Sequence, residues 1–383
     1  MPTLTRGSIR ISDMTKTIHL DAPDIGPVEK EKVCAAIDSG YVSTFGPLVG
    51  EFEKAFAGVV GAPRAVAVQS GTAALHMALH ILGVGEGDEV IVPATTFAAT
   101  LHAVMYVRAT PVIVDIDPKT WCLCPAAFKA AITPRTRAVI PVHLYGNASD
   151  MEHITAIAAA AGIFVVEDAT ESLSAFLSGR HLGMFGDIGC FSFNGNKLMT
   201  TGGGGMMVAR SSTVLDRAVY LVNQANPREG QEGFQEVGFN YRMPNLNAAL
   251  GLAQLSRLNG FIELKKSFHR IYEAKLRARG ICGMQEIYPG ADPSWWFTAV
   301  IFKDNAEVIR VHEGLKKMGI PSRRIFKPMQ TFQYAGTFQR GSCDNANRLY
   351  DRGLCLPSST LNTEKIIEEV CDAIEGLMKK GSS

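Results

Sequence analysis

The sequence predicts an α/β protein, in which a large domain holds a doubly wound, mostly parallel sheet of seven strands and a smaller α+β domain follows. Between about residues 60 and 210, short apolar runs alternate with longer segments of helical period. Most of these runs lack polar alternation, which indicates strands covered on both faces by helices. With 383 residues, 46% of them apolar and 20% charged, the chain can bury a substantial core.

Seven apolar runs are the predicted strands of the sheet: residues 65–69, 89–94, 110–116, 137–144, 163–168, 188–193 and 204–209. The intervening segments 72–83 and 151–162 have the length and the apolar spacing of helices that connect parallel strands. A sheet with helices on both faces is the expected result.

The alternation of short apolar runs and helical segments ends near residue 245. A long helical pattern begins there and ends in glycine at residue 280, and a final helix is predicted at 364–380. We therefore expect a large domain over residues 1–250, including an N-terminal segment, and a small C-terminal domain over residues 251–383.

Charge and cysteine usage restrict the partners. The chain has 38 basic and 37 acidic residues, so neither a nucleic acid nor a membrane surface is expected as a partner. The N-terminal residues lack the apolar core of a signal peptide, and a cytoplasmic location is expected. Cys122, Cys124, His76 and His80 have no matching set of ligands around them, so no metal site is expected.

Ligands of open parallel sheets bind at the carboxyl ends of the strands, so the strand-to-helix junctions are the places to search. The first junction is QSGTAAL at 69–75, where unpaired N–H groups of a helix start could hold a phosphate, although Ser and Thr are also ordinary helix caps. The second is Asp168 at the end of an apolar strand, where a carboxylate is costly unless it meets a cation or a donor. An N-cap for the next helix is the other interpretation.

The third junction is SFNGNKLMTTGGGG at 192–205. Ser192 and Asn194 follow a strand, and Lys197 comes three residues later. A partly desolvated lysine has a lowered pKa and attacks carbonyls to form a Schiff base, whereas a single lysine is ordinarily a surface charge. The four glycines at 202–205 predict that another group approaches the backbone closely there, because glycine runs are costly to order. We expect this group to be a bound cofactor.

One cofactor accounts for all three junctions. Pyridoxal 5'-phosphate (PLP) needs an anion site for its phosphate, an acid beside its ring nitrogen and an amine for its aldehyde. Phe97, just beyond the second predicted strand, could cover one face of the pyridine ring.

The sequence resembles the DegT/StrS-type sugar aminotransferases, which are PLP enzymes of fold type I that aminate nucleotide-linked keto sugars. The resemblance covers nearly the whole chain and is carried by the stretches at 39–57, 69–79, 87–100, 110–118, 166–173, 192–205, 237–251 and 352–358. The lysine motif together with GFNYRMPNLNAALG is the most specific part.

The resemblance implies roles for individual residues. Lys197 matches the lysine that holds the cofactor covalently, and Asp168 matches the acid that faces the pyridine nitrogen. Further cofactor contacts are implied for Thr72, Ala73 and Ser192 at the phosphate, for Phe97 on the ring, and for Asn194 and Glu171 in the lysine and Asp motifs.

The resemblance also implies substrate and subunit contacts. Asn240 matches an asparagine that reaches the phosphate in the neighbouring subunit, so a homodimer with a shared active site is expected. Arg242 is expected near the nucleotide diphosphate, with a structural ion pair as the alternative. Lys327, in the stretch RRIFKPMQ, is expected to contact the substrate as well.

Some positions depart from the commonest pattern of the family. Asn194 replaces a histidine and Glu171 replaces a glutamine that would lie near the phenolic oxygen of the cofactor. Both features resemble a branch that acts on UDP-linked 4-keto-6-deoxy-N-acetylglucosamine, although Phe326 and Gln330 differ from that branch. The expected reaction is transfer of an amino group from L-glutamate to C4 of UDP-2-acetamido-2,6-dideoxy-4-hexulose.

Alternatives remain open at this point. The substrate could be a dTDP- or GDP-linked keto sugar. The protein could also be a non-catalytic PLP-binding regulator, or a nicotinamide-dependent oxidoreductase, although the glycine pattern of the latter is missing after the first strand. A sugar C3-dehydratase of the same family would carry histidine in place of Lys197.

Overall fold

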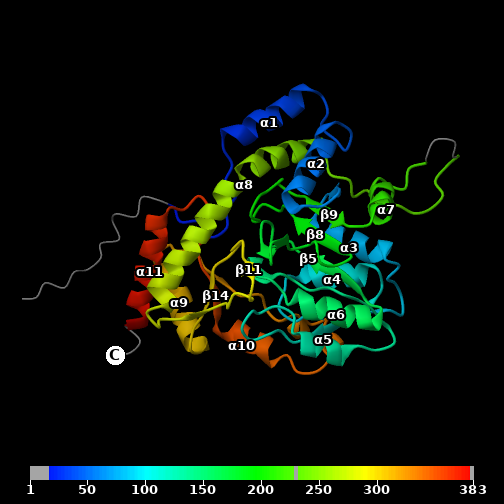
Figure 1. The fold of residues 1–383 in the computed structure, drawn as a ribbon. Helices are drawn as coiled ribbons and strands as arrows, with labels where there is room; N and C mark the ends of the chain where they lie inside the picture. The colour runs from blue at the N-terminus through cyan, green and yellow to red at the C-terminus, as the bar shows by residue number, and fades with distance from the viewer. Residues whose placement is uncertain (1–16, 228–231, 380–383) are drawn as a thin grey trace, which may run out of the picture.

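The computed structural model describes residues 17–227 and 232–379 of the chain, and its centre is a seven-stranded sheet (Figure 1). The strand order is β1-β9-β8-β5-β4-β2-β3. Within this sheet β9 runs against its neighbours, since it pairs antiparallel with both β1 and β8, while the other pairs are parallel. The strands are β1 (Ala65–Val68), β2 (Glu89–Pro93), β3 (Thr110–Val114), β4 (Thr136–Val139), β5 (Phe164–Asp168), β8 (Ile188–Ser192) and β9 (Gly205–Ala209). The predicted mostly parallel seven-stranded sheet is confirmed.

Helices cover both faces of this sheet. Alternate residues of β1 belong to different apolar clusters, with Val66 and Val68 on one face and Ala65 and Ala67 on the other. The first face packs against α3 (Gly71–Ile81), α4 (Ala98–Tyr106) and α7 (Ser212–Val222), and the second against α2 (Leu48–Val60), α5 (Pro125–Ala131) and α6 (Met151–Ala161). Burial on both faces explains why the strands have no polar alternation.

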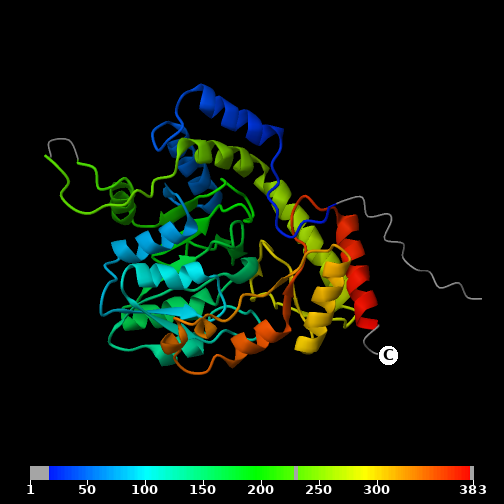
Figure 2. The same ribbon diagram turned by 180° about the vertical axis from the view of Figure 1, so that it is seen from behind.

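A second, smaller sheet lies in the C-terminal part, seen from behind in Figure 2. Its antiparallel order is β10-β12-β14-β13, and α8, α9 and α11 pack on it in one apolar cluster. These elements are β10 (Gly283–Met284), β12 (Ala299–Ile301), β13 (Arg323–Arg324), β14 (Gly353–Cys355), α8 (Asn245–Tyr272), α9 (Asn305–Lys317) and α11 (Glu364–Lys379). The predicted long and final helices are thus present. The domain division at residue 250 stays a prediction, and α8 runs through that position.

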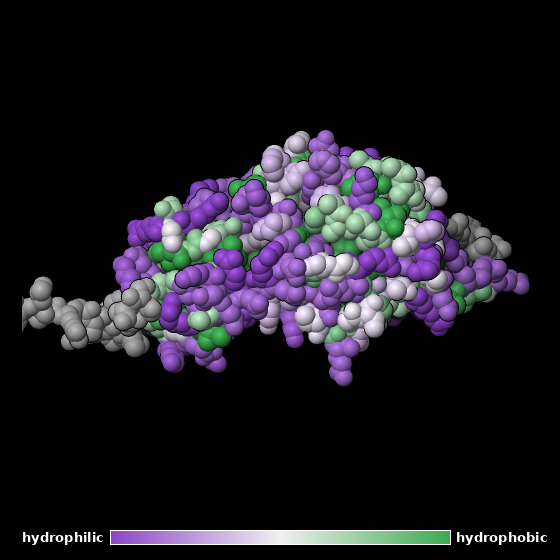
Figure 3. All heavy atoms as spheres, turned by 90° about the horizontal axis from the view of Figure 1, so that it is seen from below, coloured by the Kyte–Doolittle hydropathy of each residue, from purple (hydrophilic) through white to green (hydrophobic). Residues whose placement is uncertain are grey.

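The remaining elements are short or peripheral. They are α1 (Pro27–Asp38), α10 (Asp344–Arg352), the three-stranded sheet β11-β6-β7 (Ala291–Asp292, Phe176–Leu177, Arg180–His181), the 3-10 turns Leu144–Gly146, Met329–Thr331 and Gly336–Phe338, and a π-helical end of α8 at Glu273–Arg277. Within residues 17–227 and 232–379, no helix combines the length and the apolar character needed to cross a bilayer. Figure 3 shows hydrophilic side chains over much of one face, with hydrophobic side chains in separate patches.

Candidate active site

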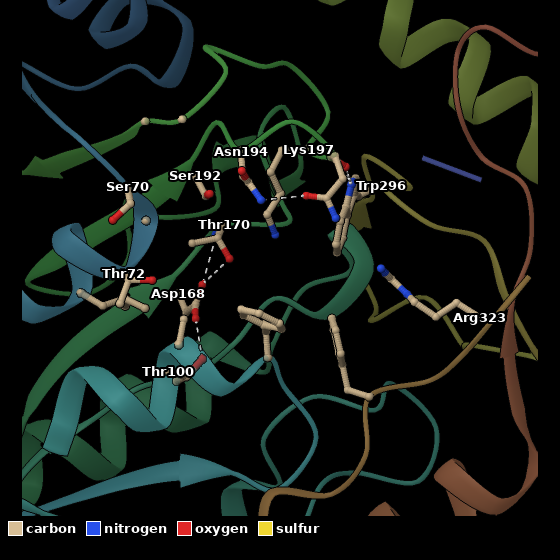
Figure 4. A pocket seen from close by; sticks show the side chains of 18 residues that line it. Ser70, Thr72, Thr100, Asp168, Thr170, Ser192, Asn194, Lys197, Trp296 and Arg323 are labelled. Atoms are coloured by element: carbon tan, nitrogen blue, oxygen red, sulfur yellow. Dashed lines mark hydrogen bonds between the residues drawn. The ribbon is translucent and has the colours of Figure 1, made fainter. Parts of the chain in front are cut away.

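A cavity of about 330 Å³ lies at the carboxyl ends of β5 and β8, beside the N-terminus of α3 (Figure 4). Ligand pockets in proteins commonly have volumes of about 300–1,000 Å³. Six of the residues predicted from the sequence line it together: Thr72, Phe97, Asp168, Ser192, Asn194 and Lys197. The three junctions that were separate in the sequence therefore open into one cavity.

The first turn of α3 forms one end of the cavity. Ser70 is the N-cap residue, and its hydroxyl accepts a hydrogen bond of 3.0 Å from the Ala73 N–H. A Cβ atom on Gly71 would lie 2.7 Å from Ser192 Cβ, so only glycine lets the helix start approach the end of β8 this closely. The expected phosphate contact of Ala73 stays a prediction, and its N–H already donates to Ser70. Helix-start N–H groups that lack an intrahelical partner suit an anion.

Asp168 is held rigidly at the end of β5, where its exposed fraction is 3%. Thr100 Oγ1 donates a hydrogen bond of 2.8 Å to Oδ2, and Thr170 donates to Oδ1 through its hydroxyl at 2.7 Å and its N–H at 3.2 Å. Thr96 Oγ1 lies 2.9 Å from Thr100 Oγ1 and extends the network. Burying a carboxylate without hydrogen-bond donors is costly in free energy. The donors of this network offset the cost that the sequence led us to expect for Asp168.

Lys197 follows β8, in a turn closed by a hydrogen bond of 3.0 Å from its N–H to the Asn194 carbonyl. Its Nζ lies 4.0 Å from the centre of the Trp296 ring and 3.8 Å from Glu171 Oε1. Burial lowers the pKa of Lys197, and the nearby carboxylates of Glu171 and Asp168 oppose that shift. An amine with a lowered pKa is available as a base or nucleophile nearer neutral pH.

Aromatic rings and one arginine form the wall opposite β5. Trp296 donates its indole N–H to the Asn196 carbonyl at 2.7 Å. The rings of Phe97 and Phe326 lie 6.1 Å apart at the mouth, where Phe97 is 60% exposed. Arg323 lies 3.5 Å from Asp21 and completes this wall.

The glycine run has an explanation within the protein itself, while its expected closeness to a cofactor stays a prediction. A Cβ atom on Gly205 would lie 2.5 Å from the Ser70 carbonyl oxygen, and one on Gly204 would clash with Thr201 Oγ1. Gly202 has a φ of +79°, which other residues rarely adopt. Gly203 and Gly204 line the cavity, and a Cβ atom on Gly203 would meet only the Gln69 carbonyl oxygen, at 3.9 Å. Close packing within the protein therefore accounts for most of the run.

Besides Ala73, four predicted residues lie outside the cavity lining. Glu171 is buried behind Lys197. Asn240 is exposed, and Lys327 is exposed between Phe326 and Pro328. Arg242 donates from Nε to the Thr44 carbonyl at 3.1 Å, which is neither the expected nucleotide contact nor the alternative ion pair. Their functional roles stay predictions.

The sequence analysis did not predict several residues that line the cavity, some of which also hydrogen-bond to other lining residues. They are Ser70, Thr100, Thr170, Asn196, Trp296, Arg323 and Phe326. Thr170 had a local signal, because an aspartate side chain commonly accepts a hydrogen bond from the backbone N–H two residues later in the chain. Trp296 and Arg323 come from the C-terminal part, and no local pattern indicates that they reach this cavity.

The chain is similar to known sugar aminotransferases over nearly its whole length. It is 37% identical to the GDP-perosamine synthase of Caulobacter vibrioides over 372 residues, covering 96% of this chain and all of the relative. It is 36% identical to the GDP-perosamine synthase of Escherichia coli O157:H7 over 361 residues, covering 94% and 98%. These names describe the relatives.

A solved structure shows the same fold. The aminotransferase TlmJ from Streptoalloteichus hindustanus superposes with a TM-score of 0.90 at 26% identity, covering 96% of this chain and all of that one. This similarity confirms the predicted fold type I. Residues 23–375 match the sequence profile of one family. The chain therefore belongs to the DegT/DnrJ/EryC1/StrS family of PLP-dependent aminotransferases.

Proposed function

We propose that the protein transfers an amino group from L-glutamate to C4 of a nucleotide-linked 4-keto-6-deoxy sugar. Membership of the family makes it a PLP-dependent sugar aminotransferase, whereas the donor, the position and the nucleotide are proposals. The observation that carries the proposal is that Lys197 and Asp168 face one cavity beside the start of α3.

The names of the two relatives support a GDP-linked sugar rather than the UDP-linked sugar expected from the sequence. We therefore propose the GDP-linked keto sugar as the first candidate substrate. The UDP-linked 2-acetamido sugar is the second, and a dTDP-linked sugar is the third. Asn194 and Glu171 differ from the common family motif and had suggested the UDP branch. Both residues are expected near the cofactor, so neither would recognise the nucleotide directly.

The side chains in the cavity fit PLP. The turn Ser70–Thr72 and the hydroxyl of Ser192 would hold its phosphate, since helix-start N–H groups and hydroxyls suit an anion. Asp168 would face its ring nitrogen, and the amine of Lys197 would hold its aldehyde. When bound, PLP supplies an electron sink for the carbon that loses a proton.

Lys197 is the proposed general base and general acid. Its lowered pKa lets the neutral amine accept a proton from the α-carbon of the donor, and the resulting ammonium would donate a proton to C4′ of the cofactor. Asp168 is kept in one orientation by Thr100 and Thr170, so its charge needs no reorganisation during the reaction. Trp296 covers the amine on one side and limits the access of water.

We propose that the enzyme works as a homodimer. Asn240 lies outside the cavity of its own chain, which leaves it available to the site of a second copy. Two apolar side chains, Val237 and Phe45, are 81% and 80% exposed, and a second copy would cover such surface. Arg242 and Lys327 are the proposed nucleotide contacts.

The test is a coupled assay. The purified protein is loaded with PLP and given L-glutamate with the GDP-, UDP- or dTDP-linked 4-keto-6-deoxy sugar. Formation of 2-oxoglutarate together with a 4-amino sugar of the expected mass supports the proposal, and the nucleotide with the highest kcat/KM identifies the substrate. If none of the three sugars is aminated, the proposed reaction is wrong.

A further inference from the structure

Glu171 and Lys197 form a buried acid–base pair at the cavity, in which Lys197 lines the cavity and Glu171 lies behind it. Glu171 Oε1 lies 3.8 Å from Lys197 Nζ, and the two side chains are 2% and 13% exposed. The other carboxylate oxygen, Oε2, accepts a hydrogen bond of 2.9 Å from the Tyr145 N–H. One oxygen of Glu171 is therefore anchored to the backbone and the other faces the amine.

The backbone around Tyr145 is bent to make this anchor. Tyr145 has φ 57° and ψ 18°, a left-handed conformation that residues other than glycine rarely adopt because it is strained. Gly146 follows with a φ of +94°, and a Cβ atom there would lie 2.5 Å from Ser294 Oγ. The chain thus accepts a strained, tightly packed turn at the point where it holds the Glu171 carboxyl group.

Burial and charge act in opposite directions on both members of the pair. Burial raises the pKa of Glu171 to about 7, whereas the charge of Lys197 and the Tyr145 N–H lower it. Burial also lowers the pKa of Lys197. The titratable and charged groups that face Glu171 from the surrounding elements are Lys197, Asp168, Arg323, Tyr145, Cys122 and Cys355. As a result, two protonation states become similar in free energy: the ion pair of carboxylate and ammonium, and the neutral pair of carboxylic acid and amine.

The other carboxylates near Lys197 are already engaged. Both oxygens of Asp168 accept hydrogen bonds, from Thr100 and Thr170. Asp21 Oδ2 accepts a hydrogen bond of 3.2 Å from Asn196 and lies 3.5 Å from Arg323 Nη1. Glu171 is the carboxylate that presents an oxygen to the amine.

We propose that Glu171 and Lys197 share one proton at neutral pH, and that Glu171 is the acid–base partner of Lys197. In the transfer an N–H bond of the Lys197 ammonium breaks and an O–H bond forms on Glu171 Oε1, which leaves a neutral amine and a neutral acid with no change in net charge. The reverse step returns the proton. The separation of 3.8 Å closes to hydrogen-bond distance with a side-chain shift of about 1 Å.

This inference rests on the proposed function for its catalytic meaning, but its test needs neither substrate nor activity. Cofactor-free wild type and Glu171→Gln are labelled at lysine with acetic anhydride across a series of pH values, and the peptides are quantified by mass spectrometry. The side-chain amide of the Glu171→Gln variant keeps an acceptor for the Tyr145 N–H. Because an opposite charge within about 4–6 Å shifts a pKa by roughly 1–3 units, we expect the labelling midpoint of Lys197 to fall by at least about one pH unit.

Two controls keep the result interpretable. Lys54, which is exposed on α2, should label identically in both proteins. Glu171→Asp keeps the charge and should keep the midpoint of Lys197 near that of the wild type. Difference infrared spectra between pH 7 and pH 9 should show a protonated carboxyl band in the wild type that is missing in Glu171→Gln.

An unchanged Lys197 midpoint in Glu171→Gln, or a wild type without that carboxyl band, would overturn the shared proton. If the coupled sugar assay still succeeds in that case, the proposed function stands and only the role of Glu171 is lost. If the pair behaves as expected and the sugar assay fails, the shared proton stands and the proposed reaction is wrong.

Discussion

Thr100 Oγ1 donates a hydrogen bond of 2.8 Å to Asp168 Oδ2 and thereby ties helix α4 to the end of strand β5. We expect Thr100→Val, which preserves the shape of the side chain, to lower kcat/KM by about tenfold or more, since a hydrogen bond to a charged group contributes roughly 1.5–3 kcal/mol. PLP titrations and steady-state kinetics on the two proteins measure the effect.

The chain offers a matched control for Thr100. Thr95 is also a buried threonine, at 1% exposure, and its hydroxyl has no hydrogen-bond partner among the described residues. Thr95→Val should therefore leave PLP affinity and kcat/KM close to those of the wild type. Equal losses in the two variants would mean that the hydroxyl of Thr100 has no special relation to Asp168.

Lys197→Ala should lose covalent attachment of PLP. After reduction with borohydride, wild type should carry the cofactor mass on the peptide that contains Lys197, and the variant should carry none. Activity should fall by about 10²–10⁴-fold or more, the range of a lost general acid–base group. Lys54→Ala is the control, and attachment at another lysine in the wild type would refute the assignment.

Two glycines of the run should respond differently. Gly205→Ala should lower the free energy of unfolding by about 1–3 kcal/mol, because its Cβ would lie 2.5 Å from the Ser70 carbonyl oxygen. Gly203→Leu should reduce PLP occupancy more than stability, because Gly203 lines the cavity with its nearest neighbour at 3.9 Å. Urea unfolding and PLP titration separate the two effects, and a reversed order would contradict this explanation.

A shared active site predicts complementation between inactive subunits. Lys197→Ala and Asn240→Ala should each be inactive alone, and mixing the two under subunit exchange should restore activity in the one site that has both residues intact. Light scattering should report a dimer for each protein. If mixed subunits exchange and stay inactive, Asn240 does not serve the neighbouring site.

Glu89 should govern part of the acid sensitivity of the fold. Hydrogen bonds from Arg340, Thr133 and Arg135 lower the pKa of this nearly buried carboxyl from 4.5 to about 2, although burial by itself would raise it. A depressed folded-state pKa adds stability above pH 4.5 that is lost as the pH falls towards 2. Glu89→Gln should therefore be less stable at pH 7 and show a flatter loss over that acid range, as measured by urea unfolding.

Glu86→Gln is the matched control for Glu89. Glu86 is exposed and lies three residues earlier in the chain. Its substitution should leave the pH dependence of unfolding unchanged. If it flattens the acid limb as much as Glu89→Gln does, the contact between Arg340 and Glu89 is not its cause.

The sequence was sufficient for the sheet and for the residues at its strand ends. Strands buried on both faces must be apolar throughout, so their runs are visible locally, and each of the seven predicted runs overlaps a strand of the sheet. The carboxyl ends of parallel strands meet at one edge, so Asp168 and Lys197 could be placed together without any long-range information.

Only the tertiary structure decided the rest of the site. Trp296 and Arg323 reach the cavity from the C-terminal part, far beyond Lys197 in the chain, and Thr100 reaches Asp168 from another helix. The pairing of Glu171 with Lys197 depends on a left-handed turn at Tyr145, and the glycines at 204 and 205 are required by contacts with Thr201 and Ser70. Local patterns report burial and turn chemistry. Contacts between distant segments depend on how whole elements pack, and only the folded chain determines them.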